Sequence, residues 1–376
     1  MNVSQTKPES GNQYRHPLVL AGAGHAHLVM MRYWRDQGYR PPEGTVMITP
    51  EPRAWYSGMM PGLIAGRFRL EQCAVDLNPW CHALGITLLR ANIKSLHCQQ
   101  RQLVLEDGTG LGYDVLSINT GSMTGLSADH DGSVLMIPAK PFPHFIEHWQ
   151  HWQSTSPHTL MIAGGGAAAF ELAMALRRRF PAIPLKVVCA SVLLASHAAA
   201  TRTLALECLQ QQRIDCVQHT RITAIREGEV CSGSHSLGRP DALILATGAH
   251  CLPWYQTSGL ACDHAGFLKI NASLQSLSDP RVLVAGDAAA LPDSQRSGVF
   301  SVRHGPVLAN NVHALLEHSA LEHYQPQAKA LALLATADGG ALMSYGNCGA
   351  GGKAVRPLLG RWKDHLDLGF MRRHAI

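Results

Sequence analysis

The sequence lacks a hydrophobic run long enough to cross a membrane. Its longest weakly interrupted apolar stretch, residues 187–200, contains Ser191, Ser196 and His197, and it is shorter than the roughly 20 residues that a transmembrane helix needs. Residues 1–15 are polar and contain no apolar segment of the kind found in signal peptides. We therefore expect a cytoplasmic protein in which residues 1–15 form a disordered tail.

Closely spaced cysteines are also missing. The ten cysteines never form a C-x-x-C pair, which argues against a zinc ribbon, a thioredoxin-type dithiol and the redox pair of disulfide reductases. We expect most of them to be buried thiols in a reducing compartment. His144 and His148 complete an H-x-x-E-H zinc-peptidase spelling, but such short matches arise by chance in a chain with 21 histidines. We therefore expect no metal site.

Excess charge is scarce outside the C-terminus. The formal net charge is +5, and residues 353–376 contain six basic side chains against two acidic ones. The nearly neutral body argues against nucleic-acid binding. Near the C-terminus, four apolar residues fall at helical spacing on one face: Leu359, Trp362, Leu366 and Phe370. This stripe packs on the body of the protein or rests on the inner face of the cell membrane, and the sequence leaves both interpretations open.

A glycine turn near the N-terminus predicts a nucleotide-binding fold. Residues 16–27, HPLVLAGAGHAH, indicate a strand, a tight turn at Gly22 and Gly24, and a helix start whose free backbone N–H groups can hold a pyrophosphate. The third position of this fingerprint favours a small residue, but here it holds His27. Two roles are open for His27: it pushes the helix away from the strand, or it binds phosphate together with His25.

The same order of motifs occurs again later in the chain. Gly164, Gly166 and Ala169 match the G-x-G-x-x-A spacing after an apolar strand. Each glycine turn is followed by an Asp, an apolar strand and a Thr-Gly ending, at Thr120-Gly121 and again at Gly248. The repetition predicts an α/β fold with two Rossmann-like dinucleotide-binding domains, the second inserted into the first, and a small C-terminal appendage.

The domain bounds follow from these motifs. We assign residues 16–124 and 271–325 to the first domain, 125–270 to the second, and 326–376 to a C-terminal cap that carries a basic amphipathic helix. Within residues 298–317 we expect a helix that Gly305 and Pro306 kink or restart.

Residues 56–62, YSGMMPG, are too rich in glycine and proline for a helix or a central strand. We expect a loop there that brings backbone close to a flat ligand, with Ser57 and Gly58 as contacts. A plain turn is the alternative.

The acids that usually bind the adenosine ribose at the end of a second strand are scarce here. The first domain's strand ends in Thr49, and we assign the ribose to the nearest acid, Glu51, with a solvated loop acid as the alternative. In the second domain the corresponding strand ends in Ala190-Ser191, which supplies neither an acid for NADH nor an arginine for NADPH. The choice between NADH and NADPH stays open, and so does a degenerate nicotinamide site.

With the strand that ends in Gly286-Asp287, these motifs resemble the two-dinucleotide-binding-domain flavoproteins of the pyridine nucleotide-disulfide oxidoreductase superfamily. One branch is especially similar, resembling type II NADH dehydrogenases and including the oxidoreductase module often fused ahead of selenophosphate synthetase. The similar segments are GHAH ending at His27, PEPR ending at Arg53, YSGMMPG ending at Gly62, and RWKD ending at Asp364 with the following FMR.

The resemblance implies FAD on the first domain and NAD(P)H on the second, with Asp287 binding the ribityl chain of FAD. It places Glu171 near the nicotinamide and Lys140 near the flavin. The alternatives are an ordinary acid on the helix surface or in its first turn for Glu171, and an ordinary exposed lysine for Lys140. It further implies an oxidoreductase that passes hydride from nicotinamide to flavin and electrons on to a quinone or a selenium or sulfur acceptor.

Two other functions stay open. One is a flavin-binding regulatory protein with a degenerate nicotinamide site. The other is an enzyme like sulfide:quinone reductases, related flavoproteins that use separated cysteines. Against the latter, Cys348 has no partner cysteine between Met123 and Met161, where the resemblance would place one.

Overall fold

The computed structural model describes residues 15–292 and 298–376, so nearly all of the expected N-terminal tail lies outside the described residues. The chain forms two compact units that alternate along the sequence. The first contains Met1–Pro52, Asp76–Gly121 and Pro253–Gln325, and the second contains Arg53–Val75, Ser122–Leu252 and Pro326–Ile376. Each unit has its own sheets and its own core.

The first unit is built on a mainly parallel sheet. Its parallel strands are β5 (Thr87–Arg90), β2 (Val46–Thr49), β1 (Arg15–Ala21), β8 (Gly110–Ile118) and β21 (Val282–Val284). β6 (Ile93–His97) and β7 (Gln102–Leu105) extend it as an antiparallel meander from β8. The short strands β20 (Leu268–Lys269) and β22 (Ala289–Ala290) pair separately, and the 3-10 turns η3 (Cys98–Gln100) and η4 (Gly286–Ala288) complete the unit.

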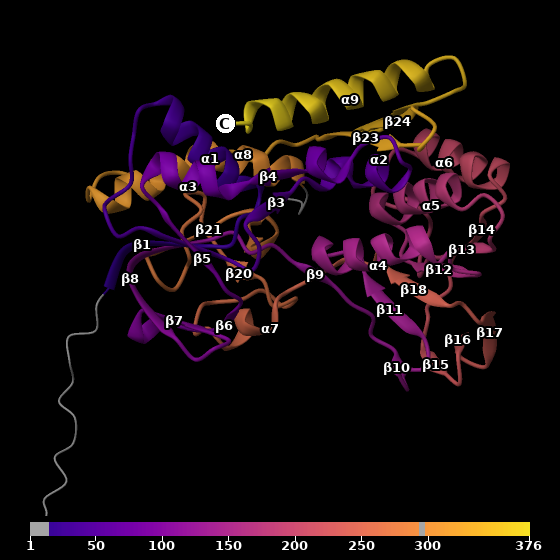
Figure 1. Ribbon diagram of the computed structural model, residues 1–376, viewed down its shortest axis with the longest axis horizontal. Coiled ribbons are helices and arrows are strands. Elements are labelled where there is room, and N and C mark those ends of the chain that lie inside the picture. Colours follow the sequence, from indigo (N-terminus) through magenta and orange to yellow (C-terminus); the bar gives the residue numbers. More distant parts are fainter. Residues whose placement is uncertain (1–14, 293–297) are drawn as a thin grey trace, which may run out of the picture. The chain divides into compact units, whose positions relative to one another are not determined.

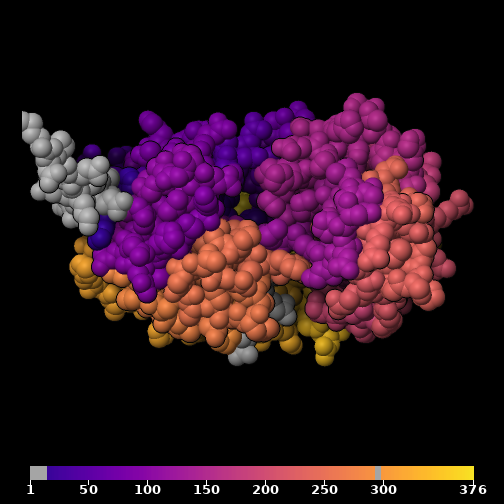
Figure 2. Space-filling view, turned by 90° about the horizontal axis from the view of Figure 1, so that it is seen from below, coloured from indigo at the N-terminus to yellow at the C-terminus, as the bar shows by residue number. Residues whose placement is uncertain are grey.

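The helices of the first unit are α1 (His25–Asp36), α3 (Leu77–Leu84), α7 (Pro253–Thr257) and α8 (Gly298–Leu316). Figure 1 shows α1 and α8 side by side over the sheet. In Figure 2 the purple and orange residues of this unit form one continuous surface, although they lie far apart in the sequence.

The predicted restart at Gly305 is wrong, because α8 continues through Pro306. A Cβ at Gly305 would stand 2.5 Å from Cβ of Val29 in α1, so the glycine permits close helix packing. We infer that the packing of α8 on α1 compensates for the one backbone hydrogen bond that Pro306 cannot donate.

The second unit has a parallel sheet between helices and a second sheet. The parallel order is β11 (Leu135–Pro138), β18 (Ala242–Leu245), β12 (Leu160–Ala163), β13 (Leu185–Val188) and β14 (Asp215–Val217). Leu160 and Ile162 face α4 (Phe142–Ser154), α5 (Ala167–Arg179) and α6 (Ala199–Gln211). Met161 and Ala163 face the sheet of β10 (Asp129–His130), β15 (Ala224–Arg226), β16 (Glu229–Ser232) and β17 (His235–Gly238). Successive residues of a buried strand thus fill two cores.

The C-terminal part of the second unit adds the sheet of β23 (Leu331–Ala335), β24 (Ala341–Tyr345) and β25 (Cys348–Ala350), followed by α9 (Arg356–Arg373). Figure 1 shows α9 lying along β23 and β24. The remaining short strands are β3 (Arg53–Trp55), which pairs with β4 (Ala74–Asp76), and β9 (Met123–Thr124), which pairs with β19 (Ala249–His250).

The expected loop at residues 56–62 is wrong in its local structure. The segment forms a 3-10 turn, η1 (Ser57–Met59), and a short helix, α2 (Met60–Ile64), followed by η2 (Leu70–Cys73). Pro61 lies in the first turn of α2, where its missing N–H costs little. Gly62 is covered by the ring of Phe68.

The α/β class and the two Rossmann-like folds are confirmed by the parallel sheets and their glycine turns. The ten cysteines, all within the described residues, form no disulfide: five are buried, four are half-buried and Cys348 is exposed. Among the helices formed by the described residues, none has both the length and the hydropathy needed to cross a membrane.

Candidate functional site

The first glycine turn closes around Asn119, the buried residue that follows β8. Its side-chain Oδ1 accepts a hydrogen bond from the backbone N of His27 at 3.1 Å, and its Nδ2 donates to the carbonyl of Ala285 at 2.9 Å. Its backbone N donates to Ala21 O at 2.7 Å, and its carbonyl accepts from Gly24 N at 3.2 Å. One residue therefore links the ends of β1, β8 and β21.

Three predicted binding glycines surround this asparagine. A Cβ at Gly22 would stand 2.6 Å from the Asn119 carbonyl oxygen, and one at Gly286 would stand 2.5 Å from Asn119 Nδ2. Gly24 lies against Asn119 Oδ1 in the same way, and Gly22 and Gly286 also have left-handed φ values of +87° and +65°. The structure thus brings Gly22, Gly24 and Gly286 together around a residue that the sequence analysis missed. The available signal was a polar residue between the apolar strand and Thr120.

His27 is a structural residue of this turn. Its side chain is fully buried, with Nδ1 2.6 Å from Gly22 O and Nε2 2.8 Å from Ser117 Oγ. Because a carbonyl only accepts, Nδ1 carries the proton and Nε2 accepts from the serine hydroxyl. Burial lowers the pKa of His27 to about 4, so the ring is neutral. With both nitrogens engaged inside the protein, His27 is not a phosphate ligand.

The other predicted residues of the first unit lie at the carboxyl ends of its strands. Thr120 Oγ1 lies 2.7 Å from the hydroxyl of Tyr255, which donates to the carbonyl of Gly121 at 2.8 Å. Asp287 follows β21 within η4, and His25 is the first residue of α1. Glu51 lies half-buried in the segment after β2. This is the edge at which open α/β sheets bind their ligands.

The second glycine turn has the same form. Gly164 has φ +142° and lies against the carbonyl of Ala246, so a side chain there would clash with backbone. Gly166 directly precedes α5, and no side chain of the described residues caps that helix. Among the described residues, chain neighbours apart, no heavy atom lies within 4 Å of a Cβ placed at Gly166 or Gly248. Ala169 is buried in the first turns of α5.

These features fit a pyrophosphate-bearing cofactor at both turns. Gly24 precedes α1 as Gly166 precedes α5, and within the described residues neither helix has a side-chain cap. An uncapped helix start offers backbone N–H groups and a positive dipole end to an anion.

Gly58 and Glu171 belong to a buried charged cluster under α9. Lys363 Nζ donates to Asp367 Oδ2 at 2.9 Å and to the carbonyl of Gly58 at 2.8 Å. Tyr56 donates its hydroxyl proton to Asp367 Oδ1 at 3.1 Å. Glu171 Oε1 accepts from the backbone N of Ala335, the last residue of β23, at 2.7 Å. The cluster joins the segment after β3 to α5, β23 and α9.

Burial and charge act against each other in this cluster. Desolvation raises the pKa of Glu171 and of Asp367, although Lys363 works to lower both. Burial alone would lower the pKa of Lys363, but the surrounding carboxylates, Glu171 first, outweigh it and raise that pKa. The lysine is therefore held charged between acids that are easier to protonate than usual.

The predicted single apolar face of the C-terminal helix is wrong. Leu359 and Phe370 are buried, and Phe370 stacks on Tyr56 with ring centroids 4.4 Å apart. Trp362 and Leu366 instead lie on the outer face, 43% and 44% exposed. The inner face includes the charged cluster, so α9 buries polar groups together with two of the four apolar residues.

Two further predicted residues lie in the second unit. Lys140 is half-buried after β11, and its carbonyl accepts a hydrogen bond from Thr124 N at 3.2 Å. Ser57 is the first residue of η1.

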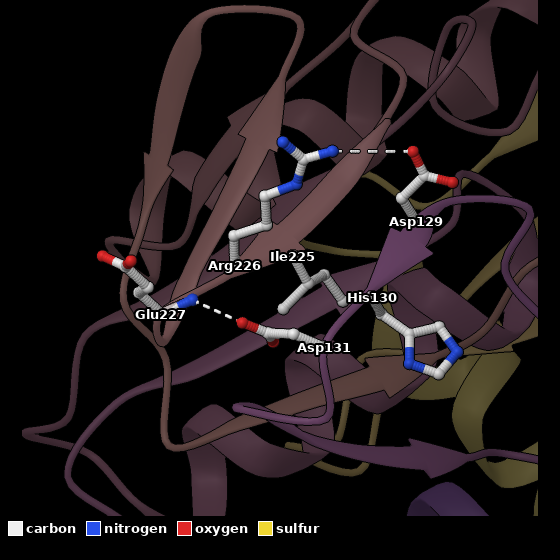
Figure 3. A pocket seen from close by; sticks show the side chains of 6 residues that line it. All are labelled: Asp129, His130, Asp131, Ile225, Arg226 and Glu227. Carbon is white, nitrogen blue, oxygen red and sulfur yellow. Dashed lines mark hydrogen bonds and ion pairs between the residues drawn. The ribbon is translucent and has the colours of Figure 1, made fainter.

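A shallow hollow of about 350 Å³ lies on the second unit between β10 and the hairpin of β15 and β16. It is lined by Asp129, His130, Asp131, Ile225, Arg226 and Glu227. Figure 3 shows Arg226 turned towards Asp129, at 3.7 Å, and Asp131 turned towards the backbone N of Glu227, at 2.7 Å. Such exposed pairs contribute little energy, and we assign the hollow no role.

Comparisons with known proteins agree with this architecture. The family model described as pyridine nucleotide-disulphide oxidoreductase matches residues 16–314. The sulfide:quinone oxidoreductase from the hyperthermophilic bacterium Aquifex aeolicus is similar in structure, with a TM-score of 0.75, 15% identity, and 96% of this chain and 92% of that chain covered.

Two further solved structures are also similar. A ferredoxin reductase from Rhodopseudomonas palustris gives a TM-score of 0.72 at 17% identity, covering 88% of this chain and 82% of that one. The water-forming NADH oxidase from Lactobacillus brevis, bound to NADH, gives a TM-score of 0.70 at 14% identity, covering 88% of this chain and 75% of that one. At these identities the likeness is one of fold.

Replacing Asn119 by Ala tests the closure of the first turn. We expect Asn119→Ala to lower the free energy of unfolding by about 2 kcal/mol, because the His27 N–H and the Ala285 carbonyl lose a buried partner. Urea denaturation followed by circular dichroism measures the loss. Asn92→Ala, which removes an exposed asparagine bonded to Glu106, is the matched control and stays close to wild type. Equal stability of the two variants would contradict this closure.

Replacing Lys363 by Met tests the charged cluster. We expect a loss of about 3 kcal/mol at about pH 8, because two buried carboxylates lose their cation. An acid whose pKa is raised by folding makes the protein less stable as the pH rises above its unfolded-state pKa, so the loss shrinks as the pH falls and the carboxyls bind protons. Denaturation at a series of pH values measures this trend. Arg361→Met, on the exposed face of α9, is the control, and a loss independent of pH would contradict the prediction.

Proposed function

Because the chain belongs to the pyridine nucleotide-disulphide oxidoreductase family, and is an oxidoreductase on that ground, we propose that it passes electrons from NAD(P)H through FAD to a quinone or to a selenium or sulfur acceptor. The observation that supports this best is the pair of uncapped helix starts behind two tight glycine turns, one in each unit. Solved structures with this fold include proteins named as an NADH oxidase and a sulfide:quinone oxidoreductase.

In this proposal FAD binds to the first domain, residues 16–124 and 271–325. The backbone at Gly22 and Gly24, with His25, holds the pyrophosphate, Glu51 holds the adenosine ribose, and Asp287 accepts from the ribityl hydroxyls. Thr120, Gly121 and Gly286 shape the edge along which the cofactor lies. When bound, the flavin supplies the two-electron chemistry.

The nicotinamide cofactor binds to the second domain, residues 125–270, and residues 326–376 form the cap. Gly164, Gly166, Ala169 and Gly248 receive its pyrophosphate, where the space beside Gly166 and Gly248 is open. We propose that Glu171 lies beside the nicotinamide and that Lys140 lies beside the flavin. Ser57 and Gly58 contact the flavin as well. Burial raises the pKa of Glu171, and perturbed carboxyl groups of this kind are frequent at functional sites.

Anaerobic mixing of the purified protein with NADH and with NADPH tests this function. We expect a flavin spectrum that at least one nucleotide bleaches. Gly166→Val should weaken nucleotide binding by about tenfold or more. The valine side chain would occupy the open space before α5, where we propose that the backbone N–H groups bind the charged pyrophosphate. FAD content should not change. Gly352→Val, also into open space and outside the predicted sites, is the control.

The outcomes separate the alternatives. Absence of flavin would refute the proposal. A flavin that neither nucleotide reduces would favour the regulatory protein with a degenerate site. Reduction by sulfide in place of both nucleotides would favour the sulfide:quinone reductase-like enzyme.

We also propose that the outer face of α9 rests on an anionic membrane surface, from which a lipid-soluble quinone can be drawn. Leu358, Trp362 and Leu366 form an exposed apolar stripe on this face. The exposed charges of the helix, Arg361, Arg372 and Arg373, are all positive. Both of its acids are engaged in ion pairs, Asp364 with Arg67 and Asp367 with Lys363. An apolar stripe flanked by cations matches an anionic interface.

Co-sedimentation with vesicles tests this contact. The protein should bind vesicles rich in phosphatidylglycerol more strongly than vesicles of phosphatidylcholine alone. Replacing Trp362 and Leu366 by Ser should weaken binding by about tenfold or more, because each buried apolar side chain contributes about 1.5 kcal/mol. Leu277→Ser, a comparably exposed leucine in the other unit, is the control. Equal binding by both variants would exclude this face.

A further inference from the structure

His304 of α8 holds the segment that carries Asp287. Its side chain is 3% exposed, and its Nδ1 accepts a hydrogen bond from the backbone N–H of Gly286 at 3.1 Å. Its Nε2 is buried without a hydrogen-bond partner among residues 15–292 and 298–376. The ring meets Tyr324 edge to face, with centroids 4.5 Å apart. A buried histidine bonded to the Ala285–Gly286 peptide, one residue before Asp287, is well placed to set the course of that segment.

The Gly286 peptide is confined by three groups. Asn119 donates to the carbonyl of Ala285 at 2.9 Å, and His304 accepts from the N–H of Gly286. A Cβ at Gly286 would stand 2.5 Å from Asn119 Nδ2 and 2.7 Å from Ser301 Oγ. Because buried peptide groups need partners, the loss of one of these bonds would turn the segment.

We propose that His304 is a positioning residue which, through Nδ1, fixes the Gly286 peptide and so presents Asp287 to the cofactor. This inference rests on the proposed function, in which Asp287 binds the polyol chain of FAD. His304 acts on the cofactor only through the peptide. Since Nδ1 accepts, the ring is neutral with its proton on Nε2. Burial lowers its pKa to about 4, although Asp287 works to raise it, and this keeps the acceptor form at neutral pH.

The two amide side chains separate positioning from packing. Asparagine places Oδ1 on Cγ, where histidine has Nδ1, so His304→Asn keeps the acceptor but loses ring volume. Glutamine is larger and places its oxygen near the Nε2 position, so His304→Gln keeps more volume but loses the acceptor at Nδ1. A positioning role predicts that Asn rescues function, whereas a packing role predicts that Gln does.

The experiment measures FAD affinity of the deflavinated full chain from flavin fluorescence. We expect His304→Asn to bind FAD within about threefold of wild type, and His304→Gln and His304→Ala to bind about tenfold more weakly, the effect of one buried hydrogen bond. Val312→Ala is the matched control, because Val312 is fully buried on the same helix. It should lower the melting temperature and leave FAD affinity unchanged.

Hydrogen exchange at the Gly286 amide gives a second measurement on the cofactor-free protein. The amide should be protected in wild type and His304→Asn, and it should exchange faster in the Gln and Ala variants. Failure of wild type to bind FAD would refute the proposed function. If wild type binds FAD, then equal affinity of the Asn and Gln variants, or affinities that follow only the melting temperatures, would refute the positioning role.

Discussion

The arrangement of the glycine turn and the strand ends in the first unit depends on the buried side-chain amide of Asn119. An amide deprived of water must find partners for both its oxygen and its nitrogen. Asn119 meets that demand with the first turn of α1 on one side and the end of β21 on the other. Gly22, Gly24 and Gly286 leave the room that this requires. The turn at Gly22 and Gly24 and the segment of Asp287 are therefore parts of one hydrogen-bonded assembly.

Local patterns predicted the elements of this edge but not what joins them. The strands and helix starts around Gly22 and Gly164 follow from periodicity and glycine spacing, which are properties of adjacent residues. The bonds of Asn119 to His27 and Ala285 cross 92 and 166 residues, and no sequence window contains both ends. His27 shows the same limit, because its role follows from Ser117, a residue of another strand.

The error in α9 has a tertiary cause. Helical spacing places Leu359 and Trp362 on the same face, yet in the structure Leu359 is buried and Trp362 is exposed. The groups that pack against the helix decide which of its residues are buried. Those partners include the Gly58 carbonyl and Tyr56, which draw Lys363 and Asp367 inward. A buried ion pair is costly unless its remaining groups are bonded, and the segment after β3 supplies these bonds. In α9, tertiary contacts therefore decide which residues are buried, and helical spacing alone does not.

The glycine turns of the two units are closed by the same backbone hydrogen bond, but only the first unit adds side-chain hydrogen bonds. Ala246 follows β18 as Asn119 follows β8, and its N–H bonds Ala163 O at 2.8 Å as that of Asn119 bonds Ala21 O at 2.7 Å. Alanine has no amide with which to reach a third strand. Backbone closure alone is thus enough to build this kind of glycine turn, and Asn119 additionally connects the turn to β21. That difference matches the proposed function, in which FAD binds to the first unit and needs both the glycine turn and Asp287 in fixed positions. The nicotinamide cofactor of the second unit needs no such third strand.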